Sequence, residues 1–319
     1  MFSELPYVPS ASDLIDRSFR AGSNAARDVR GRNGPREKLL RLAEEKRVSI
    51  IGGIVEGELK AIIKQFPSYD QLPPFYQKLL DIQISKDKFK KSLGAADWAL
   101  KNLKQLRAST NRRMRAQKET AFAKQYLGRV SSIIKQISGD LDILIEIKQQ
   151  LQSFPLIRDD EPTLVVAGYP NAGKSTFLRN LTGSKVQIAA YHFTTTKIQV
   201  GRKKILHTTY QVIDVPGLLD RPMEKRNIVE QQAMLALEEV ADKILFLIDP
   251  EQNLNPQMSL LSEVKEKFNV PIFVAINKVD AVEKSIIKEI EANFSKLKII
   301  RLSAINTSQC EETFKTIIS

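Results

Sequence analysis

The stretch GYPNAGKST, residues 168–176, constrains the fold of this chain more than any other feature. Its spacing fits the phosphate-binding loop pattern G-x-x-x-x-G-K-[ST], with Gly168, Gly173, Lys174 and Ser175 at the required positions. The glycines allow a tight turn whose backbone N–H groups converge on an anion, and Lys174 adds positive charge toward the phosphates. The β-rich run TLVVA before the loop and the helical run STFLRNLTG after it complete the pattern. The predicted phosphate contacts are Asn171, Ala172, Gly173, Lys174, Ser175 and Thr176.

The second half of the chain alternates between β-rich and helical segments. Short runs such as YQVID, KILFLID, PIFVAIN and KIIRLS are separated by segments with helical periodicity. This alternation predicts a mostly parallel sheet with helices on both faces. We therefore expect residues 161–319 to form an α/β domain around the phosphate-binding loop.

The first half, residues 1–160, is predicted to form an all-α helical bundle. Apolar residues recur at three- and four-residue steps, and proline and glycine divide the region into four to six helices. One apolar stripe comprises Val130, Ile133, Ile137, Leu141 and Leu144. We expect this stripe to pack in the bundle core, together with Trp98, the only tryptophan of the chain.

The net charge of +12 is concentrated in the helical half. Residues 1–160 carry 29 Lys and Arg against 19 Asp and Glu, whereas residues 161–319 carry 20 against 18. No apolar run is long enough to cross a bilayer, and the N-terminal residues lack the pattern of a signal peptide. We expect a cytoplasmic protein without a membrane partner, in which the lone Cys310 is a reduced, structural thiol.

A second motif selects the base. Asn277, Lys278 and Asp280 of NKVD follow the run PIFVAI, at the edge where a doubly wound sheet binds its ligand. A carboxylate at Asp280 can accept hydrogen bonds from the N1–H and exocyclic amino group of guanine, a donor pair that adenine lacks. The motif predicts GTP and GDP as ligands. Ser303 and Ala304 would add backbone contacts to the guanine oxygen.

Between these motifs, DVPG at 214–217 ends the run YQVID. Asp214 is expected to hold Mg²⁺ through water, and Gly217 to turn its N–H toward the γ-phosphate, so that the next segment senses that phosphate. Upstream, HFTTT offers hydroxyls for the Mg²⁺ shell; we favour Thr195, and Thr194 and Thr196 stay open. The predicted magnesium ligands are Ser175, Thr195 and Asp214.

Hydrolysis is predicted to be slow. The residue after Gly217 is Leu218, which cannot orient an attacking water as a glutamine does in other GTPases. Asn171 offers another route, because its amide oxygen can bind a monovalent cation such as K⁺ that adds positive charge in the transition state. A purely structural turn asparagine is the alternative. The predicted catalytic residues are Asn171, Lys174, Thr195 and Gly217.

Residues 101–130 carry nine Lys and Arg against one Glu. On a helix, most of these basic residues fall on one face and apolar residues on the other. Such a face suits RNA phosphates, with a strongly salt-dependent affinity. A solvated helix face is the alternative, and an anionic membrane is disfavoured because the apolar face lacks bulky Trp and Phe. The predicted RNA-binding residues are Lys101, Lys104, Arg107, Arg112, Arg113, Arg115 and Lys118.

GYPNAGKST, YHFTTT, DVPGLLD and NKVD, in this order behind a basic helical region, resemble the Obg-related branch of translation-factor-class GTPases. They most closely resemble the nucleolar GTP-binding protein family of large-ribosomal-subunit assembly in its short archaeal form, as do LPYVPSASDLIDRSFR and DVPGLLDRPMEKRN. The resemblance covers essentially the whole chain and implies potassium stimulation for relatives with an asparagine at the position of Asn171. Two departures limit it: His192 replaces the usual proline, and eukaryotic members continue beyond the point where this chain ends, at Ser319.

The resemblance implies a GTPase that joins large-subunit precursors, contacts ribosomal RNA through its helical domain and changes affinity with nucleotide state. We therefore expect a slow, monomeric GTPase with GTP or GDP, Mg²⁺ and K⁺ as cofactors. Two alternatives stay open. One is a non-catalytic placeholder in which GTP stabilises an RNA-binding conformation, and the other is a translation or RNA-modification GTPase of the same branch.

Overall fold

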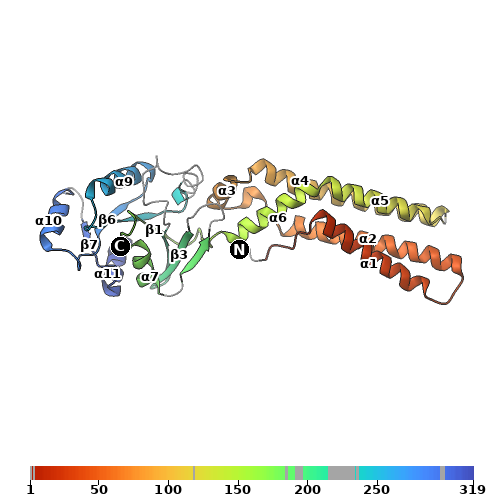
Figure 1. The fold of residues 1–319 in the computed structure, drawn as a ribbon, viewed down its shortest axis with the longest axis horizontal. Helices are drawn as coiled ribbons and strands as arrows, with labels where there is room; N and C mark the ends of the chain where they lie inside the picture. The colour runs from red at the N-terminus through yellow and green to blue at the C-terminus, as the bar shows by residue number, and fades with distance from the viewer. Residues whose placement is uncertain are drawn as a thin grey trace. The chain divides into compact units, whose positions relative to one another are not determined.

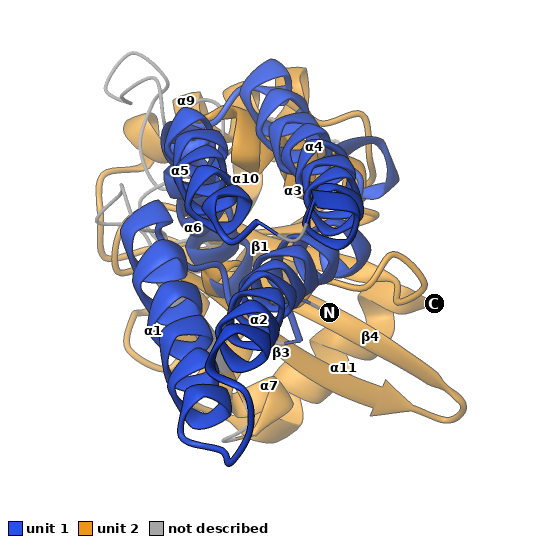
Figure 2. Ribbon diagram, turned by 90° about the vertical axis from the view of Figure 1, so that its right-hand side faces the viewer, with its two compact units in different colours: residues 1–72, 83–152 blue, residues 73–82, 153–319 orange. Residues whose placement is uncertain are grey.

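The structure, a computed structural model, describes residues 2, 4–117, 119–183, 186–190, 197–214, 234, 237–294 and 299–319; the side chains of 187–190 and 197 are outside the description. The chain forms two compact units (Figure 2). The first comprises residues 1–72 and 83–152, and the second comprises residues 73–82 and 153–319.

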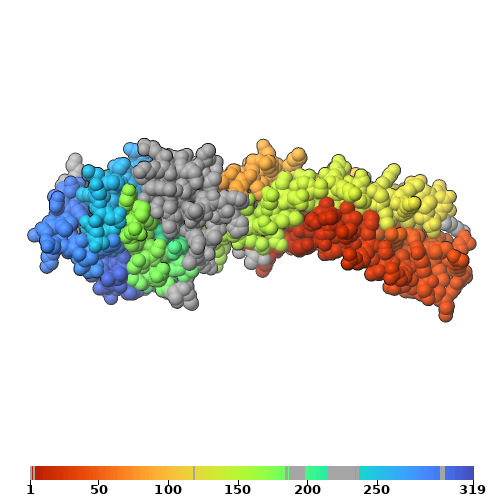
Figure 3. All heavy atoms as spheres, in the orientation of Figure 1, coloured from red at the N-terminus to blue at the C-terminus, as the bar shows by residue number. Residues whose placement is uncertain are grey.

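The first unit is a bundle of long helices. In the ribbon, α1 packs beside α2, and α4 packs against α2 and α5 (Figure 1). On the face drawn in Figure 3, the side chains of α1 and α5 lie against each other. The elements of this unit are α1 (Ala11–Arg30), α2 (Arg36–Gln65), the short 3-10 helix η1 (Tyr69–Gln71), α4 (Lys86–Gln117), α5 (Ala121–Gln136) and α6 (Ser138–Ser153).

Local sequence signals explain where these helices begin and end. The Ser10 hydroxyl accepts a hydrogen bond from the Asp13 backbone N–H and caps the start of α1. Gly31 follows the last residue of α1, and its N–H donates to the Arg27 carbonyl. Pro35 precedes α2, where its lack of an N–H costs nothing.

The bundle core confirms the helical periodicity but corrects two assignments. Val130, Ile137, Leu141 and Leu144 are buried, as expected. Ile133 is only half-buried, and the neighbouring Ile134 is fully buried in its place. Trp98 was expected to pack in the core, but 41% of its surface is exposed. The reason is rotational: Ala96, Ala99 and Leu100 fill the buried face of this part of α4.

The second unit is built on a seven-stranded sheet in the order β2-β3-β4-β1-β5-β6-β7. The five strands from β4 to β7 in this order pair in parallel, whereas β2–β3 and β3–β4 pair antiparallel. The predicted, mostly parallel sheet is therefore confirmed. The strands are β1 (Thr163–Gly168), β2 (Gln187–Ala190), β3 (Lys197–Ile205), β4 (Thr208–Asp214), β5 (Lys243–Ile248), β6 (Ile272–Ile276) and β7 (Ile299–Arg301).

Helices cover both faces of this sheet. α7 and α11 pack on one face through Leu178, Phe314 and their neighbours, and α9 lies on the other face (Figure 1). All six residues of β1 are buried, as expected of a central parallel strand. The helices of this unit are α3 (Pro74–Asp81), α7 (Lys174–Thr182), α9 (Leu254–Lys267), α10 (Lys284–Ala292) and α11 (Thr307–Ile318).

Candidate functional site

The motifs meet because parallel strands end at one edge of a sheet. β1 ends at Gly168, where the phosphate-binding loop begins, and β4 ends at Asp214, which pairs with Val166 of β1. β6 ends at Ile276, directly before Asn277. Loops that leave the carboxyl ends of such strands form the usual ligand site of an open α/β sheet.

Glycine is required at two positions of the phosphate-binding loop. Gly168 has φ +145°, and a Cβ there would lie 2.5 Å from the carbonyl oxygen of Leu247. Gly173 has φ +92°, and a Cβ there would lie 2.2 Å from Nδ2 of Asn277. Asn171 is exposed and adopts φ +65°, a conformation that asparagine tolerates better than most residues. The loop therefore has a left-handed geometry at both Asn171 and Gly173.

Lys174 spans the phosphate-binding loop from the first residue of α7. Its Nζ donates to the carbonyl oxygens of Gly168, at 2.8 Å, and Tyr169, at 3.0 Å. The N–H groups of the first turn of α7 lack intrahelical acceptors, so the loop and the helix start together suit an anion. Thr176 is half-buried in this first turn, and Ala172 is fully buried.

Two predicted magnesium ligands lie together. The Ser175 hydroxyl donates to Oδ2 of Asp214, which joins the start of α7 to the end of β4. The Asp214 side chain is fully buried. A hydroxyl and a carboxylate are hard oxygen ligands, and so this pair fits Mg²⁺. The third predicted ligand, Thr195, lies outside the described residues, as do Thr194, Thr196, Gly217 and Leu218.

Asn277 connects three parts of the site. It is 2% exposed, its Nδ2 donates to the Ala172 carbonyl at 2.7 Å, and its Oδ1 accepts from the Ala304 N–H at 2.8 Å. The Ser303 N–H donates to Oε1 of Gln309 at 2.7 Å. Both backbone donors expected at the guanine oxygen are therefore bonded to protein side chains in this structure: the Ala304 N–H satisfies the buried amide of Asn277, and the Ser303 N–H satisfies Gln309.

Lys278 and Asp280 differ in their surroundings. Asp280 is exposed, and no described residue forms an ion pair with it. Lys278 adopts φ +57°, and its Nζ donates to Asp249 at 2.7 Å and to Glu251 at 2.8 Å. Although partial burial disfavours its charged form, the bonds and charges of these two carboxylates together raise the pKa of Lys278. The Asp280 carboxylate thus stays available for a ligand, whereas Lys278 is held in place.

The segment after β5 contains site residues that the motif search missed. Asp249 is fully buried, and besides Lys278 it accepts a hydrogen bond from Nε2 of Gln252 at 2.6 Å. The same Nε2 donates to the Pro170 carbonyl of the phosphate-binding loop at 2.8 Å. The Gln257 side chain bonds the backbone N–H and carbonyl of Asp249. The polar run DPEQNLNPQ directly after a buried strand was the signal that could have indicated this support.

The predicted RNA-binding residues of α4 fall into two groups. Arg107 is a structural residue, because its guanidinium forms a 2.8 Å ion pair with Glu56 of α2, whose side chain is 8% exposed. Lys101 pairs with Asp97 one turn earlier, and the Arg113 guanidinium lies 4.2 Å from the centroid of the Phe122 ring. The second group consists of Lys104, Arg112 and Arg115, which are exposed, and Lys118 lies outside the described residues.

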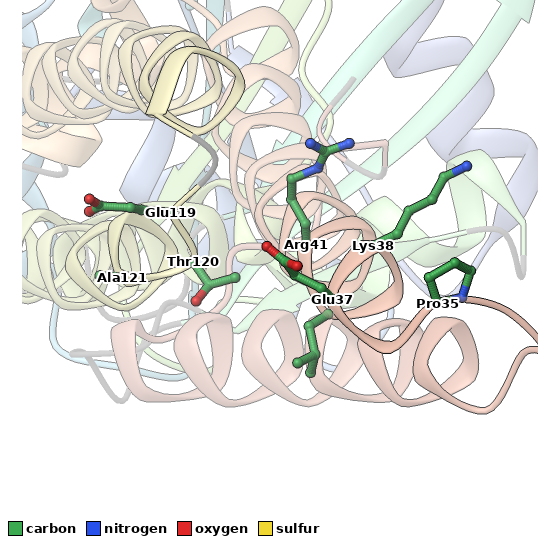
Figure 4. Close-up of a pocket in the computed structure, with 8 residues that line it drawn as sticks. Pro35, Glu37, Lys38, Arg41, Glu119, Thr120 and Ala121 are labelled. Atoms are coloured by element: carbon green, nitrogen blue, oxygen red, sulfur yellow. The ribbon is translucent and has the colours of Figure 1, made fainter.

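A cavity of about 710 Å³ lies in the first unit, between the start of α2 and the start of α5. In Figure 4, Pro35, Glu37, Lys38 and Arg41 lie on one side of the cavity, and Glu119, Thr120 and Ala121 lie on the other. Its lining mixes both signs of charge, which gives a nucleotide phosphate no consistently positive surface. The loops at the sheet edge therefore remain the candidate nucleotide site.

Two further observations cover the described part of the chain. No helix there is both long and apolar enough to span a membrane. Within the same residues, no group of three or more His, Cys, Asp or Glu side chains is arranged to hold a metal ion. The sulfur of Cys310 is buried in α11, and burial raises the pKa of this thiol to about 11.

Two protein-family descriptions match consecutive parts of the chain. Residues 2–158 match the NOG1 N-terminal helical domain. Residues 163–278 match the 50S ribosome-binding GTPase family. The two matched ranges contain the helical half and the loops at the sheet edge as far as Lys278.

Individual proteins are also similar to this chain. The uncharacterized protein MJ1408 of Methanocaldococcus jannaschii is 37% identical over 295 residues, which cover 90% of this chain and 83% of the relative. Nucleolar GTP-binding protein 1 of Drosophila melanogaster is 31% identical over 88% of this chain, which spans only 44% of that longer protein. A solved Plasmodium falciparum structure that carries the name nucleolar GTP-binding protein 1 is 31% identical, with a TM-score of 0.44, and covers 52% of this chain and 88% of that one.

Proposed function

This chain belongs to the nucleolar GTP-binding protein 1 family, and from that premise we propose that it is a slow GTPase of large-ribosomal-subunit assembly. The single observation that carries the proposal is the set of groups at one edge of the sheet, where Asn277 bonds the phosphate-binding loop and the Ala304 backbone, and Ser175 bonds Asp214. This set combines a phosphate-binding loop, a hydroxyl–carboxylate pair and a free carboxylate, which are the parts needed for a guanine nucleotide and Mg²⁺.

In the proposed complex, the loop and Lys174 bind the phosphates. Ser175 and Asp214 hold Mg²⁺, which would neutralise phosphate charge when bound. Asp280 recognises the guanine edge, and Lys278, fixed by Asp249 and Glu251, lies beside it. Thr195 and Gly217 complete the site in this proposal. The proposed nucleotide contacts are Asn171, Ala172, Gly173, Lys174, Ser175, Thr176, Asp214, Gly217, Asn277, Lys278, Asp280, Ser303 and Ala304.

The helical unit is proposed to bind ribosomal RNA in a nucleotide-dependent way. Support comes from the net positive charge of residues 1–160 and from the exposure of Lys104, Arg112 and Arg115 on α4. Several such cations can replace counterions along an RNA backbone without reading its sequence. Arg107 is not part of this proposed surface, since it stabilises the buried carboxylate of Glu56.

Co-sedimentation with large ribosomal subunits tests the proposal. Wild-type protein and the double variant Arg112→Glu/Arg115→Glu are each pelleted with a non-hydrolysable GTP analogue or with GDP. We expect pelleting that depends on the nucleotide and is abolished by the charge reversal. Equal, negligible pelleting in all four samples would remove the ribosome from the proposed function.

The placeholder function is the second candidate, and Leu218 is the observation that favours it, because it cannot orient water. The two candidates differ in GTP turnover. We expect slow hydrolysis that is faster in potassium than in sodium, and an Asn171→Ala variant that loses the difference. Absence of hydrolysis in both salts, with and without subunits, would leave the placeholder as the function.

A further inference from the structure

Trp98 is a large aromatic side chain on the solvent side of α4. Its exposed fraction of 41% is unusual, because tryptophan is on average highly buried. Among the described residues, no aromatic ring stacks on Trp98 and no cation lies over it. Its backbone carbonyl accepts a 2.8 Å bond from the Asn102 side chain, so the backbone of this turn is supported while the indole faces solvent.

Exposed cations of α4 lie along the side of the helix that carries Trp98. At about 100° per residue, Trp98 falls on the same exposed side as Lys91, Lys101 and Arg112. No described carboxylate pairs with Lys91 or Arg112. Lys101 on the same side is already paired with Asp97. An exposed indole on a helix side that also carries the unpaired cations Lys91 and Arg112 fits a partner with flat apolar rings on an anionic backbone, and this combination is the chemistry of unpaired nucleotides.

A groove lined by polar side chains and by the apolar Leu106 and Ile133 continues along the same helix beyond Trp98. It lies between α4 and α5, has a volume of about 420 Å³, and begins at Asn102, one turn after the tryptophan. Gln105 and Ser109 follow on the α4 side, at the helical spacing that keeps them in line with Trp98. Arg129 and Ser132 line the α5 side. Amides and hydroxyls of this kind form hydrogen bonds with base edges and sugars, and Arg129 adds a charge for phosphate.

We propose that Trp98 and this groove form a site for a single-stranded RNA segment, with one base stacked on the indole and the next nucleotides along the groove. This inference rests on the proposed function, and it makes that function more specific. A purely basic helix face binds duplex and single strand alike, whereas a stacking site needs a base that is free of its own helix.

The chain offers a direct probe, because Trp98 is its only tryptophan. Intrinsic fluorescence of the full-length protein is titrated with three polyanions at one low ionic strength: a short oligouridylate, an RNA duplex of the same length, and heparin, which has no bases. We expect the oligouridylate to quench the tryptophan emission at saturation. The duplex and heparin should bind, as followed by fluorescence anisotropy of labelled probes, with little quenching.

Two substitutions separate stacking from simple apolar contact. Trp98→Leu, which keeps an apolar side chain but removes the ring, should weaken oligouridylate binding about 5- to 150-fold, the range for loss of one base–aromatic stack. Trp98→Phe should lose much less of the oligouridylate affinity. Both variants should bind heparin with the affinity of the wild type. Gln105→Ala in the groove should also weaken oligouridylate binding, whereas Gln136→Ala at the exposed end of α5 should not.

Each other outcome is decisive. Tight oligouridylate binding without quenching, or equal affinities for wild type and Trp98→Leu, would overturn the stacking site and leave the proposed RNA-binding function intact. Absence of binding to any RNA, with ribosomal subunits also failing to pellet the protein, would overturn both. Circular dichroism of each variant checks that the bundle is folded.

Discussion

At the scale of single residues, the site contains close contacts that do not tolerate a larger side chain. Asn277 bonds Ala172 and Ala304 at once, and its amide occupies the space where a side chain at Gly173 would be. Gly173 is therefore required twice, once for its φ of +92° and once for the close approach of Asn277.

Gly173→Ala is expected to reduce nucleotide affinity sharply. The new Cβ would lie 2.2 Å from the Asn277 amide, and a left-handed conformation costs roughly 1–2 kcal/mol for a residue other than glycine. We expect a loss of at least about tenfold in the affinity for a fluorescent GDP analogue. Gly128→Ala, in an open position within α5, is the matched control and should bind normally. Unchanged affinity in Gly173→Ala would contradict this account of the loop.

Glu56 should make the stability of the helical unit depend on pH. Burial, only partly offset by Arg107 and Lys104, raises the pKa of Glu56 above its ordinary 4.5. Glu56 therefore binds its proton more tightly in the folded state than in the unfolded state. The resulting stabilisation is complete below the ordinary pKa and is lost as the pH rises through the raised value. We expect Glu56→Gln to lack this component, so that its free energy of unfolding in urea falls less between about pH 4 and pH 7 than that of wild type. If the unfolding free energies of wild type and Glu56→Gln changed in parallel with pH, this role of Glu56 would be refuted.

At the scale of elements, the position of α3 in the sequence does not reveal which compact unit it belongs to. It lies within the helical half of the sequence, yet it belongs to the same compact unit as the sheet. Tyr76 anchors it: its hydroxyl accepts from the Ile157 N–H at 2.9 Å, and the carbonyl oxygens of Pro155 and Ile157 lie 3.0 and 3.1 Å from it. Lys78 of α3 adds a 2.5 Å ion pair with Glu239.

Tyr76→Phe should destabilise the second unit by about 1–2 kcal/mol, since it leaves the buried N–H of Ile157 without this acceptor. Denaturant unfolding of the full chain, followed by circular dichroism, measures the change. Tyr7→Phe is the control, because the Tyr7 hydroxyl is exposed and its bond to Asp13 is easily replaced by water. Equal stability of Tyr76→Phe and wild type would mean that the Tyr76 hydroxyl contributes nothing to holding α3.

At the scale of the whole molecule, charge is divided unequally along the chain. The surplus of positive charge lies in residues 1–160, whereas residues 161–319 are close to neutral. In the proposed function, one half therefore supplies a long-range attraction for RNA and the other supplies nucleotide binding. Attraction of this kind weakens as salt displaces condensed counterions.

The affinity for RNA should fall linearly on a plot of log K against log salt concentration. Arg112→Ala/Arg115→Ala should make the slope shallower by about 1.4–1.8, because each lost phosphate contact removes roughly 0.7–0.9 from the slope. Fluorescence anisotropy of a labelled RNA across a salt series provides the measurement. Arg107→Ala should leave the slope unchanged, since Glu56 already neutralises that guanidinium. A slope that is the same in the double variant would exclude these two arginines from the surface.

The features that the sequence determined by itself are local ones. The left-handed turns of the phosphate-binding loop, the guanine motif after a buried strand, the alternation of strands and helices and the uneven charge all follow from residue type and spacing. They depend on backbone conformations and side-chain chemistry that neighbouring residues impose. For this reason the α/β architecture behind a helical bundle was predicted correctly, and the candidate nucleotide residues of the described chain meet at one edge of the sheet.

Only the tertiary structure decided which way individual side chains face and what they meet. Periodicity placed Trp98 in the core, whereas the rotation of α4 exposes it, and Arg107 was counted among RNA contacts although Glu56 of a distant helix binds it. The support of the phosphate-binding loop by Asp249 and Gln252 joins residues about 80 positions apart. Such contacts depend on how separate elements pack against one another, and no local pattern specifies them, because packing energy is shared over the whole core.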